Sequence, residues 1–188
     1  MRTIFTSAML LFTACSVPGI FGADNSAMLS AAREGKLELM KQLKEQGADI
    51  NAKNVNNVMP MHYAAEYGHL EAMKWLKDQG ADVNSKDELG DTPMRWAAES
   101  GRLEIMKWIK EQCADIDVNA KGNYGWTPMH YAASMNRLEV VKWLKEQGAD
   151  INAKENEGKT PFDLANRRRA DSEITNWLKE NGAVTGKE

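Results

Sequence analysis

Apolar residues recur at helical spacing in short stretches that are separated by polar segments. Leu70, Met73 and Leu76 line one face of such a stretch, as they would in a helix that packs on one side. Gly80 follows, and glycine favours the left-handed conformation in which many helices end. The next residues, up to position 92, are too few and too polar for more than an extended turn. The pattern therefore predicts a short, one-sided helix followed by a projecting finger.

A shorter helix is predicted before this one-sided helix, and another is predicted after the finger. The small pair Ala64-Ala65 allows two helices to approach closely, and Gly68 ends the stretch that contains it. At the start of the next such stretch, the Thr92 hydroxyl can cap a helix and Pro93 has the backbone angle of a first turn. Each unit is thus predicted as helix, turn, helix and finger, with an apolar face that must stack on a neighbour.

Three sets of residues repeat this unit along the chain. The dipeptides that begin the shorter helices are separated by 33, 35 and 33 residues: Met59-Pro60, Thr92-Pro93, Thr127-Pro128 and Thr160-Pro161. The helix ends are near copies: Gly47-Ala48-Asp49, Gly80-Ala81-Asp82 and Gly148-Ala149-Asp150, with Cys113-Ala114-Asp115 as the divergent member. The longer helices carry Trp75, Trp108, Trp143 and Trp177. Because apolar residues flank these tryptophans, we predict that they pack between neighbouring helices.

These residues resemble the ankyrin-repeat family, whose unit of about 33 residues has a T-P-L-H-x-A-A core. The resemblance covers about residues 27–184 and implies an all-α solenoid of about five helix-turn-helix units with β-hairpin or finger loops. The domain is expected at 24–188. Its units are expected at about 27–54, 55–87, 88–122, 123–155 and 156–188.

Some positions depart from the family pattern. Arg95 and Asp163 stand where the family has histidine, so their units are expected to lack the usual hydrogen-bond partner of the shorter helix. Cys113 replaces the helix-ending glycine, and a left-handed conformation there would cost about 1 kcal/mol or more. Ile116-Asp117 look like an insertion beside it. We therefore predict that the junction of the third and fourth units is irregular and opens first.

Residues 1–23 have the features of a secretory signal peptide. One positive charge at Arg2 precedes an uncharged, largely apolar stretch over 3–17, which is too short to span a bilayer. The run that ends at Cys15 also resembles a bacterial lipobox, in which the cysteine is lipidated and becomes the new N-terminus. Cleavage at the end of the segment and lipidation of Cys15 both stay open. Either alternative predicts an exported protein, periplasmic or secreted, and only lipidation of Cys15 would attach it to the membrane.

Charge and residue content exclude several classes of function. The net charge of -3 offers no basic footprint for nucleic acid. The three histidines occupy repeat positions, and two cysteines are too few for a cysteine-based metal site. The one basic run, residues 167–169, is interpreted as a solvated helix end. We therefore predict no enzyme activity, no cofactor and no metal.

The resemblance implies a protein-binding function, because repeat arrays bind through an extended surface built from equivalent positions. A monomer with a protein partner in the periplasm or on the envelope is expected, in a narrower version as an inhibitor or immunity-type partner. The alternatives are a structural envelope lipoprotein without a high-affinity client and a secreted effector that binds a host protein. Trp126 either joins the binding surface or folds back on its own helix. The expected contact residues are Val55, Val58, Tyr67, Leu89, Asp91, Tyr124, Trp126 and Met135.

Overall fold

The computed structural model describes residues 25–113, 115–168 and 172–186. The described residues form five pairs of helices. The inner helices are α1 (Asn25–Glu34), α3 (Pro60–Tyr67), α5 (Pro93–Ser100), α7 (Pro128–Ser134) and α9 (Pro161–Arg168). The outer helices are α2 (Leu37–Glu45), α4 (Leu70–Asp78), α6 (Leu103–Gln112), α8 (Leu138–Glu146) and α10 (Glu173–Glu180). The predicted all-α repeat architecture is confirmed.

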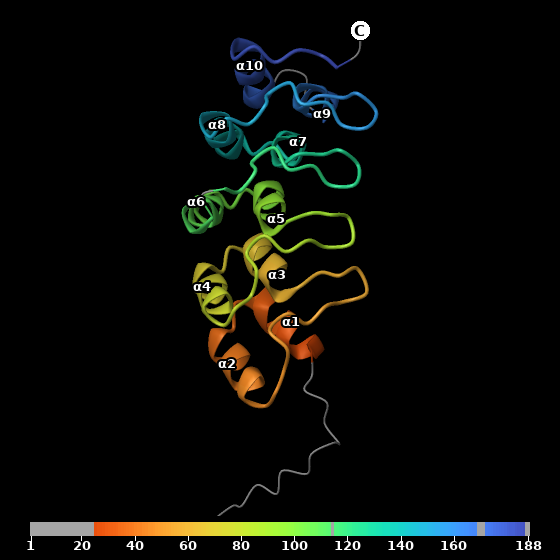
Figure 1. The fold of residues 1–188 in the computed structure, drawn as a ribbon. Helices are drawn as coiled ribbons and strands as arrows, with labels where there is room; N and C mark the ends of the chain where they lie inside the picture. Colours follow the sequence, from red (N-terminus) through yellow and green to blue (C-terminus); the bar gives the residue numbers. More distant parts are fainter. Residues whose placement is uncertain (1–24, 114, 169–171, 187–188) are drawn as a thin grey trace, which may run out of the picture.

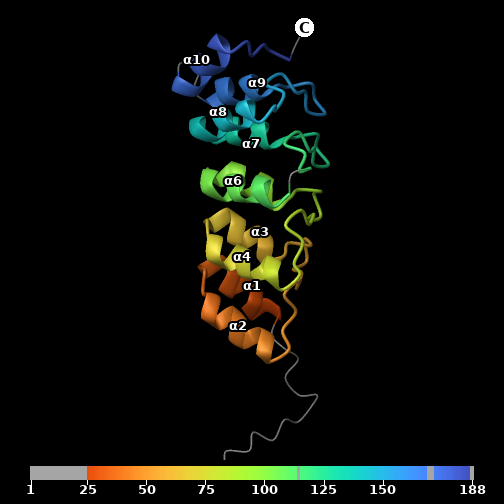
Figure 2. The ribbon, with the colours of Figure 1, turned by 60° about the vertical axis from the view of Figure 1, so that its left-hand side comes forward.

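The pairs stack into one elongated column, with the fingers projecting on the side opposite the outer helices (Figure 1). Each inner helix packs on the next, from α1 through α3, α5 and α7 to α9. The same order of units is seen when the molecule is turned (Figure 2). Equivalent positions of successive units therefore form continuous rows along the column.

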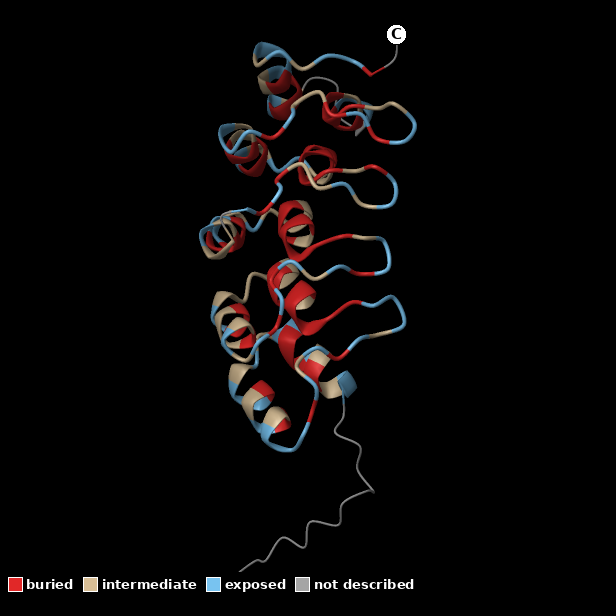
Figure 3. Ribbon diagram, in the orientation of Figure 1, coloured by how far each residue is buried: buried red, intermediate tan, exposed pale blue. Residues whose placement is uncertain are grey.

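The core runs along the inner helices and the facing sides of the outer helices (Figure 3). The alanine pairs, such as Ala64 and Ala65, are fully buried, so neighbouring inner helices approach closely. A fully buried methionine accompanies each pair from the first to the fourth unit: Met28, Met61, Met94 and Met129. Flexible thioether chains fill the irregular gaps that this close approach leaves.

The tryptophan row of the outer helices packs as predicted. Trp108 and Trp143 are each 8% exposed and belong to the core. Trp75 and Trp177 are partly buried and pack against it. This row therefore stabilises the stack and offers little surface to a ligand.

The fingers are turns rather than paired strands, since the described residues contain no β-strand. A backbone hydrogen bond closes each turn, as from Asp87 N to Asp91 O at 3.0 Å and from Gly122 N to Trp126 O at 3.0 Å. Neighbouring fingers are also joined, for example by the bond from Asn123 N to Leu89 O at 2.7 Å. These bonds hold the fingers in register.

The expected left-handed conformation of Cys113 is wrong. This residue has φ −132° and ψ 91°, which is extended backbone. The equivalent Gly80 and Gly148 do have positive φ, at 94° and 87°. The insertion predicted at Ile116-Asp117 gives the chain enough length to leave α6 without the tight left-handed turn. The strain argument for an early opening of this junction therefore fails.

The helix starts also differ from the sequence expectation. Thr92 makes no side-chain cap hydrogen bond. Asp163 was expected to leave its unit without the usual partner, yet its Oδ2 accepts from Thr160 N at 2.8 Å and from Gly186 N at 2.8 Å. His130 plays the same part in the fourth unit, where Nδ1 accepts from Thr127 N at 3.1 Å. A carboxylate therefore replaces the imidazole in the fifth unit.

Candidate partner-binding surface

In three of the described fingers, the side chain of the first residue fixes the turn. Asp87 Oδ1 accepts from Leu89 N and Asp91 N, both at 2.9 Å, and so fixes the turn from inside. Asn54 and Glu155 make the equivalent bonds in the second and fifth units. These side-chain bonds replace water at the turn amides and pre-organise the fingers.

The third and fourth fingers are linked through Gly122, which has no side chain to make these bonds. A Cβ at Gly122 would lie 2.5 Å from Asp91 Oδ1, so the Asp91 carboxylate occupies the space that a side chain would take. Tyr131 OH donates to Asp91 Oδ2 at 3.2 Å. The fourth unit thus uses a carboxylate of the third finger in place of its own.

Apolar side chains are exposed at three successive fingertips. Val55 is 94% exposed, Leu89 40% and Tyr124 59%. Exposed large apolar side chains are uncommon in the described part of this chain, so their alignment along the fingertips marks a surface suited to contact.

Trp126 lies where the fourth finger meets α7. Its ring is half-buried and lies 4.8 Å, centroid to centroid, from the Tyr131 ring. Together with Tyr124, these rings line a hollow of about 280 Å³ beside the tip of the fifth finger. Trp126 therefore folds back on its own inner helix and still presents part of its ring to the surface.

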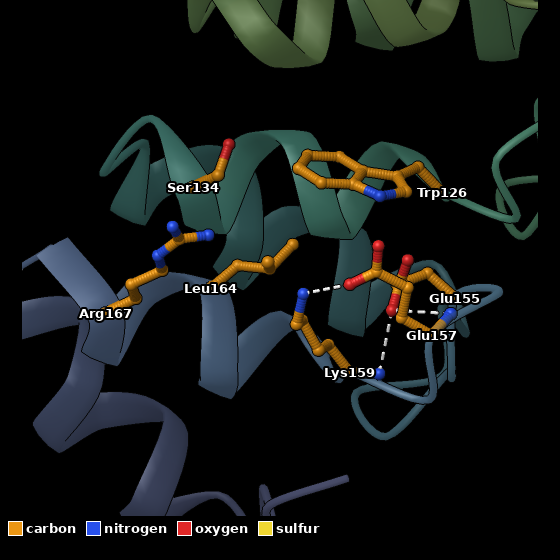
Figure 4. A pocket seen from close by; sticks show the side chains of 7 residues that line it. All are labelled: Trp126, Ser134, Glu155, Glu157, Lys159, Leu164 and Arg167. Atoms are coloured by element: carbon orange, nitrogen blue, oxygen red, sulfur yellow. Dashed lines mark hydrogen bonds and ion pairs between the residues drawn. The ribbon is translucent and has the colours of Figure 1, made fainter.

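A cleft of about 500 Å³ continues from Trp126 towards α9 (Figure 4). Trp126 and Leu164 form its apolar walls, and Arg167 reaches in from α9 beside Ser134. Lys159 lies at the finger end, where its ammonium is bound to the Glu157 carboxylate. The cleft thus has an apolar centre between two charged ends. We call the exposed sides of α3, α5, α7 and α9, with the finger sides that face them, the inner surface.

Arg95 organises a buried charge cluster in the third unit. Its guanidinium lies 3.1 Å from Asp91 Oδ2 and 3.7 Å from Asp87 Oδ2, and it is bound to the Glu99 carboxylate. It also lies 4.5 Å from the centroid of the Tyr131 ring. One cation thus faces three carboxylates and stacks on an aromatic ring.

Burial dominates the electrostatics of this cluster. Desolvation raises the pKa of Asp91, although Arg95 and the Tyr131 hydroxyl oppose the shift. The pKa of Tyr131 is raised well above its usual range, first by burial and then by the Asp91 charge. Burial and the charge of Glu99 raise the pKa of Glu66 on α3. Because Arg95 is the single cation that faces Asp87, Asp91 and Glu99, the cluster has excess negative charge.

Two expected contact residues need correction, because they are buried. Val58 is 4% exposed. Asp91 is 2% exposed and is occupied by Arg95 and Tyr131. Neither side chain is therefore available to a partner.

Two other expected contact residues lie apart from the Trp126 hollow. Tyr67 is half-buried on α3, where its hydroxyl accepts from Arg33 Nε at 3.1 Å. Met135 lines a separate hollow at the end of α7 with Ala165 and Ile174. Val55, Leu89, Tyr124 and Trp126 stay as candidates, because all four side chains are wholly or partly exposed.

Sequence reasoning missed Arg95, Leu164 and Arg167. Arg167 was assigned to a solvated helix end, although it lies in the cleft. It occupies the inner-helix position equivalent to Glu66 and Glu99, which are partly exposed on α3 and α5. Continuing that row into the divergent fifth unit would have found it.

A stack of helix pairs with fingers in register defines a solenoid repeat protein. The family model described as ankyrin repeats (3 copies) matches residues 27–122, 80–155 and 109–187. The chain belongs to the ankyrin-repeat family, whose repeats form protein-protein interaction modules and are generally non-catalytic. No curated protein matches the chain significantly.

Two further features are absent from the described residues. None of their helices has the length and apolar character needed to cross a membrane. Their histidine, cysteine and acidic side chains form no group of three or more that could hold a metal ion.

Proposed function

We propose that this protein is a monomeric, non-catalytic scaffold that binds a partner protein through its fingertips and the inner surface of its third to fifth units. The observation that carries this proposal is the hollow formed by Tyr124, Trp126 and Tyr131, which opens between two fingers that are fixed in register. Large, partly desolvated aromatic side chains next to a pocket are typical of binding hot spots.

Tyr124 and Trp126 allow this site to be tested separately from stability. Tyr124 is 59% exposed, so Tyr124→Ala should weaken partner binding by about 2 kcal/mol with little change in melting temperature. Trp126→Ala should weaken binding as much and also lower stability, because its ring packs on Tyr131. Trp108→Ala is the control, because it should lower stability without removing a contact residue. If native Tyr124→Ala and Trp126→Ala proteins bind the partner like the unsubstituted chain, this surface is not the site.

We further propose that the protein is exported and acts in the periplasm, on the envelope or outside the cell. This proposal rests on the sequence of residues 1–23 and on Cys15, which lie outside the described residues. Intact mass of protein from the envelope fraction should show loss of at least residues 1–14. Incorporation of labelled palmitate, abolished by Cys15→Ala, would select the lipid-anchored form. Recovery of the unprocessed chain would contradict export by this route.

A further inference from the structure

The inner surface has an acidic end at the second and third units. Glu66 is half-buried on α3, and Glu99 follows at the equivalent position of α5. Glu99 shares Arg95 with two buried aspartates, so that guanidinium is already outnumbered. Burial and the charge of Glu99 raise the pKa of Glu66 more than the charges of Arg33, Arg95 and Arg102 lower it. A cation supplied by a partner would offset this repulsion.

The opposite end of the inner surface carries an accessible cation. Arg167 on α9 is exposed, and Figure 4 shows its guanidinium in the cleft near Ser134 and Leu164. It pairs with none of the acidic residues that the structure describes. Lys159, at the finger end of the same cleft, is bound to Glu157. Arg167 is therefore the group of this cleft best placed to receive an anion.

Aromatic rings connect the two ends. Arg95 lies 4.8 Å from the centroid of the Trp96 ring and 4.5 Å from that of Tyr131. Tyr131 in turn contacts Trp126, which forms a wall of the cleft. A partner that pairs with both charged ends must therefore place apolar groups between them.

The distance between the ends can be derived from helix packing. Glu99 lies on α5 and Arg167 on α9, with α7 packed between these helices. Packed helices have axes about 8–10 Å apart, so the two steps span about 16–20 Å. An extended chain advances about 3.3 Å per residue, which makes this span equal to about five or six residues.

We propose that the inner surface binds an extended, charge-separated segment of a partner protein: a lysine or arginine pairs with Glu66 and Glu99, an aspartate or glutamate about five or six positions away pairs with Arg167, and an apolar side chain between them packs on Trp126. The inference rests on the proposed function and specifies the chemistry of the partner. Complementary charges at the two ends determine the register of the segment, and the apolar contact contributes affinity.

A displayed library of random twelve-residue peptides provides the probe. Selection on the full chain should enrich peptides with a basic and an acidic residue about five or six positions apart and an apolar residue between them. For an enriched peptide, Arg167→Glu should raise the dissociation constant about tenfold, because like charges would then face each other. Changing the acidic residue of the peptide to lysine should restore binding to this variant only. Binding to Glu66→Lys should likewise be restored by changing the basic residue of the peptide to glutamate. Lys107→Glu on the outer helix α6 is the matched control.

The outcomes separate this inference from the proposed function. If Tyr124→Ala and Trp126→Ala weaken the binding of enriched peptides but neither charge reversal does, the charge-separated segment is refuted and the binding surface stands. Peptides that bind equally well to all four variants would refute both. A selection that enriches no peptide overturns the extended segment alone, since a folded partner surface could still contact the fingertips.

Discussion

Replacing Arg95 by methionine is the sharpest test of the buried charge cluster. Methionine retains an apolar chain between Trp96 and Tyr131, so the change removes the positive charge while preserving much of the packing. It leaves the carboxylates of Asp91 and Asp87, which are 2% and 4% exposed, without their cation.

Removing one partner of a buried ion pair costs about 3–5 kcal/mol, because an uncompensated charge stays in the interior. Burial already raises the pKa of Asp91, so part of this cost can be relieved by protonation. We therefore expect about 3 kcal/mol, which corresponds to a fall in melting temperature of about 6–12 °C for a chain of this size.

Asp91→Asn provides the matched second variant. Asparagine can still accept the hydrogen bond from Tyr131 but has no charge. On its own, Asp91→Asn should destabilise the protein, since it removes the charge of a buried partner of Arg95. In the Arg95→Met background it should instead restore about 1 kcal/mol or more. Urea denaturation of the unsubstituted protein, the two single variants and the double variant measures the coupling between Arg95 and Asp91. A cost below about 1 kcal/mol for Arg95→Met, or the same effect of Asp91→Asn in both backgrounds, would refute the reasoning.

Three further predictions concern the rest of the stack. Burial lowers the pKa of His62 and His130 below the ordinary value of 6.5. Their contribution to stability is therefore present above that pH and is lost as the pH falls towards the lowered values. The melting temperature should fall between pH 7.5 and 5.5, and it should fall less in His130→Asn. Trp108→Ala should cost about 3 kcal/mol in urea denaturation as a large-to-small core change, and a cost under 1 kcal/mol would mean that the outer tryptophans do not pack as described. Cys113→Gly should not raise the melting temperature, because the residue is extended and glycine only increases the entropy of the unfolded chain; a higher melting temperature would show that the residue is strained.

The repeat could be predicted from the sequence because its signals are local. Proline fixes the start of each inner helix, and the alanine pairs and the outer tryptophans report burial directly. Trp108 lies in the core as its position predicted. The conformation of Cys113 could not be predicted in this way, since the family register assigns a left-handed turn that two additional residues make unnecessary.

The candidate site was only partly predictable because its contacts join different units. Arg95 looked like a lost histidine, and only the fold brings the Tyr131 ring of the next unit over its guanidinium. Asp91 was expected to face a partner, but the absence of a side chain at Gly122 leaves room for it to turn inwards. Arg167 was taken as part of a basic run, since the cleft wall that it joins comes from another unit.

Site-specific photo-crosslinking in the native cell tests the central claim most directly. A photoreactive amino acid at Tyr124, on the exposed fingertip beside the aromatic hollow, should form a discrete adduct with one other protein. The same group at Lys107, exposed on the outer helix α6, should form none. The adduct from position 124 should disappear in a Trp126→Ala background that remains folded. An adduct from position 107 alone, or one from position 124 that is insensitive to Trp126→Ala, would contradict binding through the inner surface.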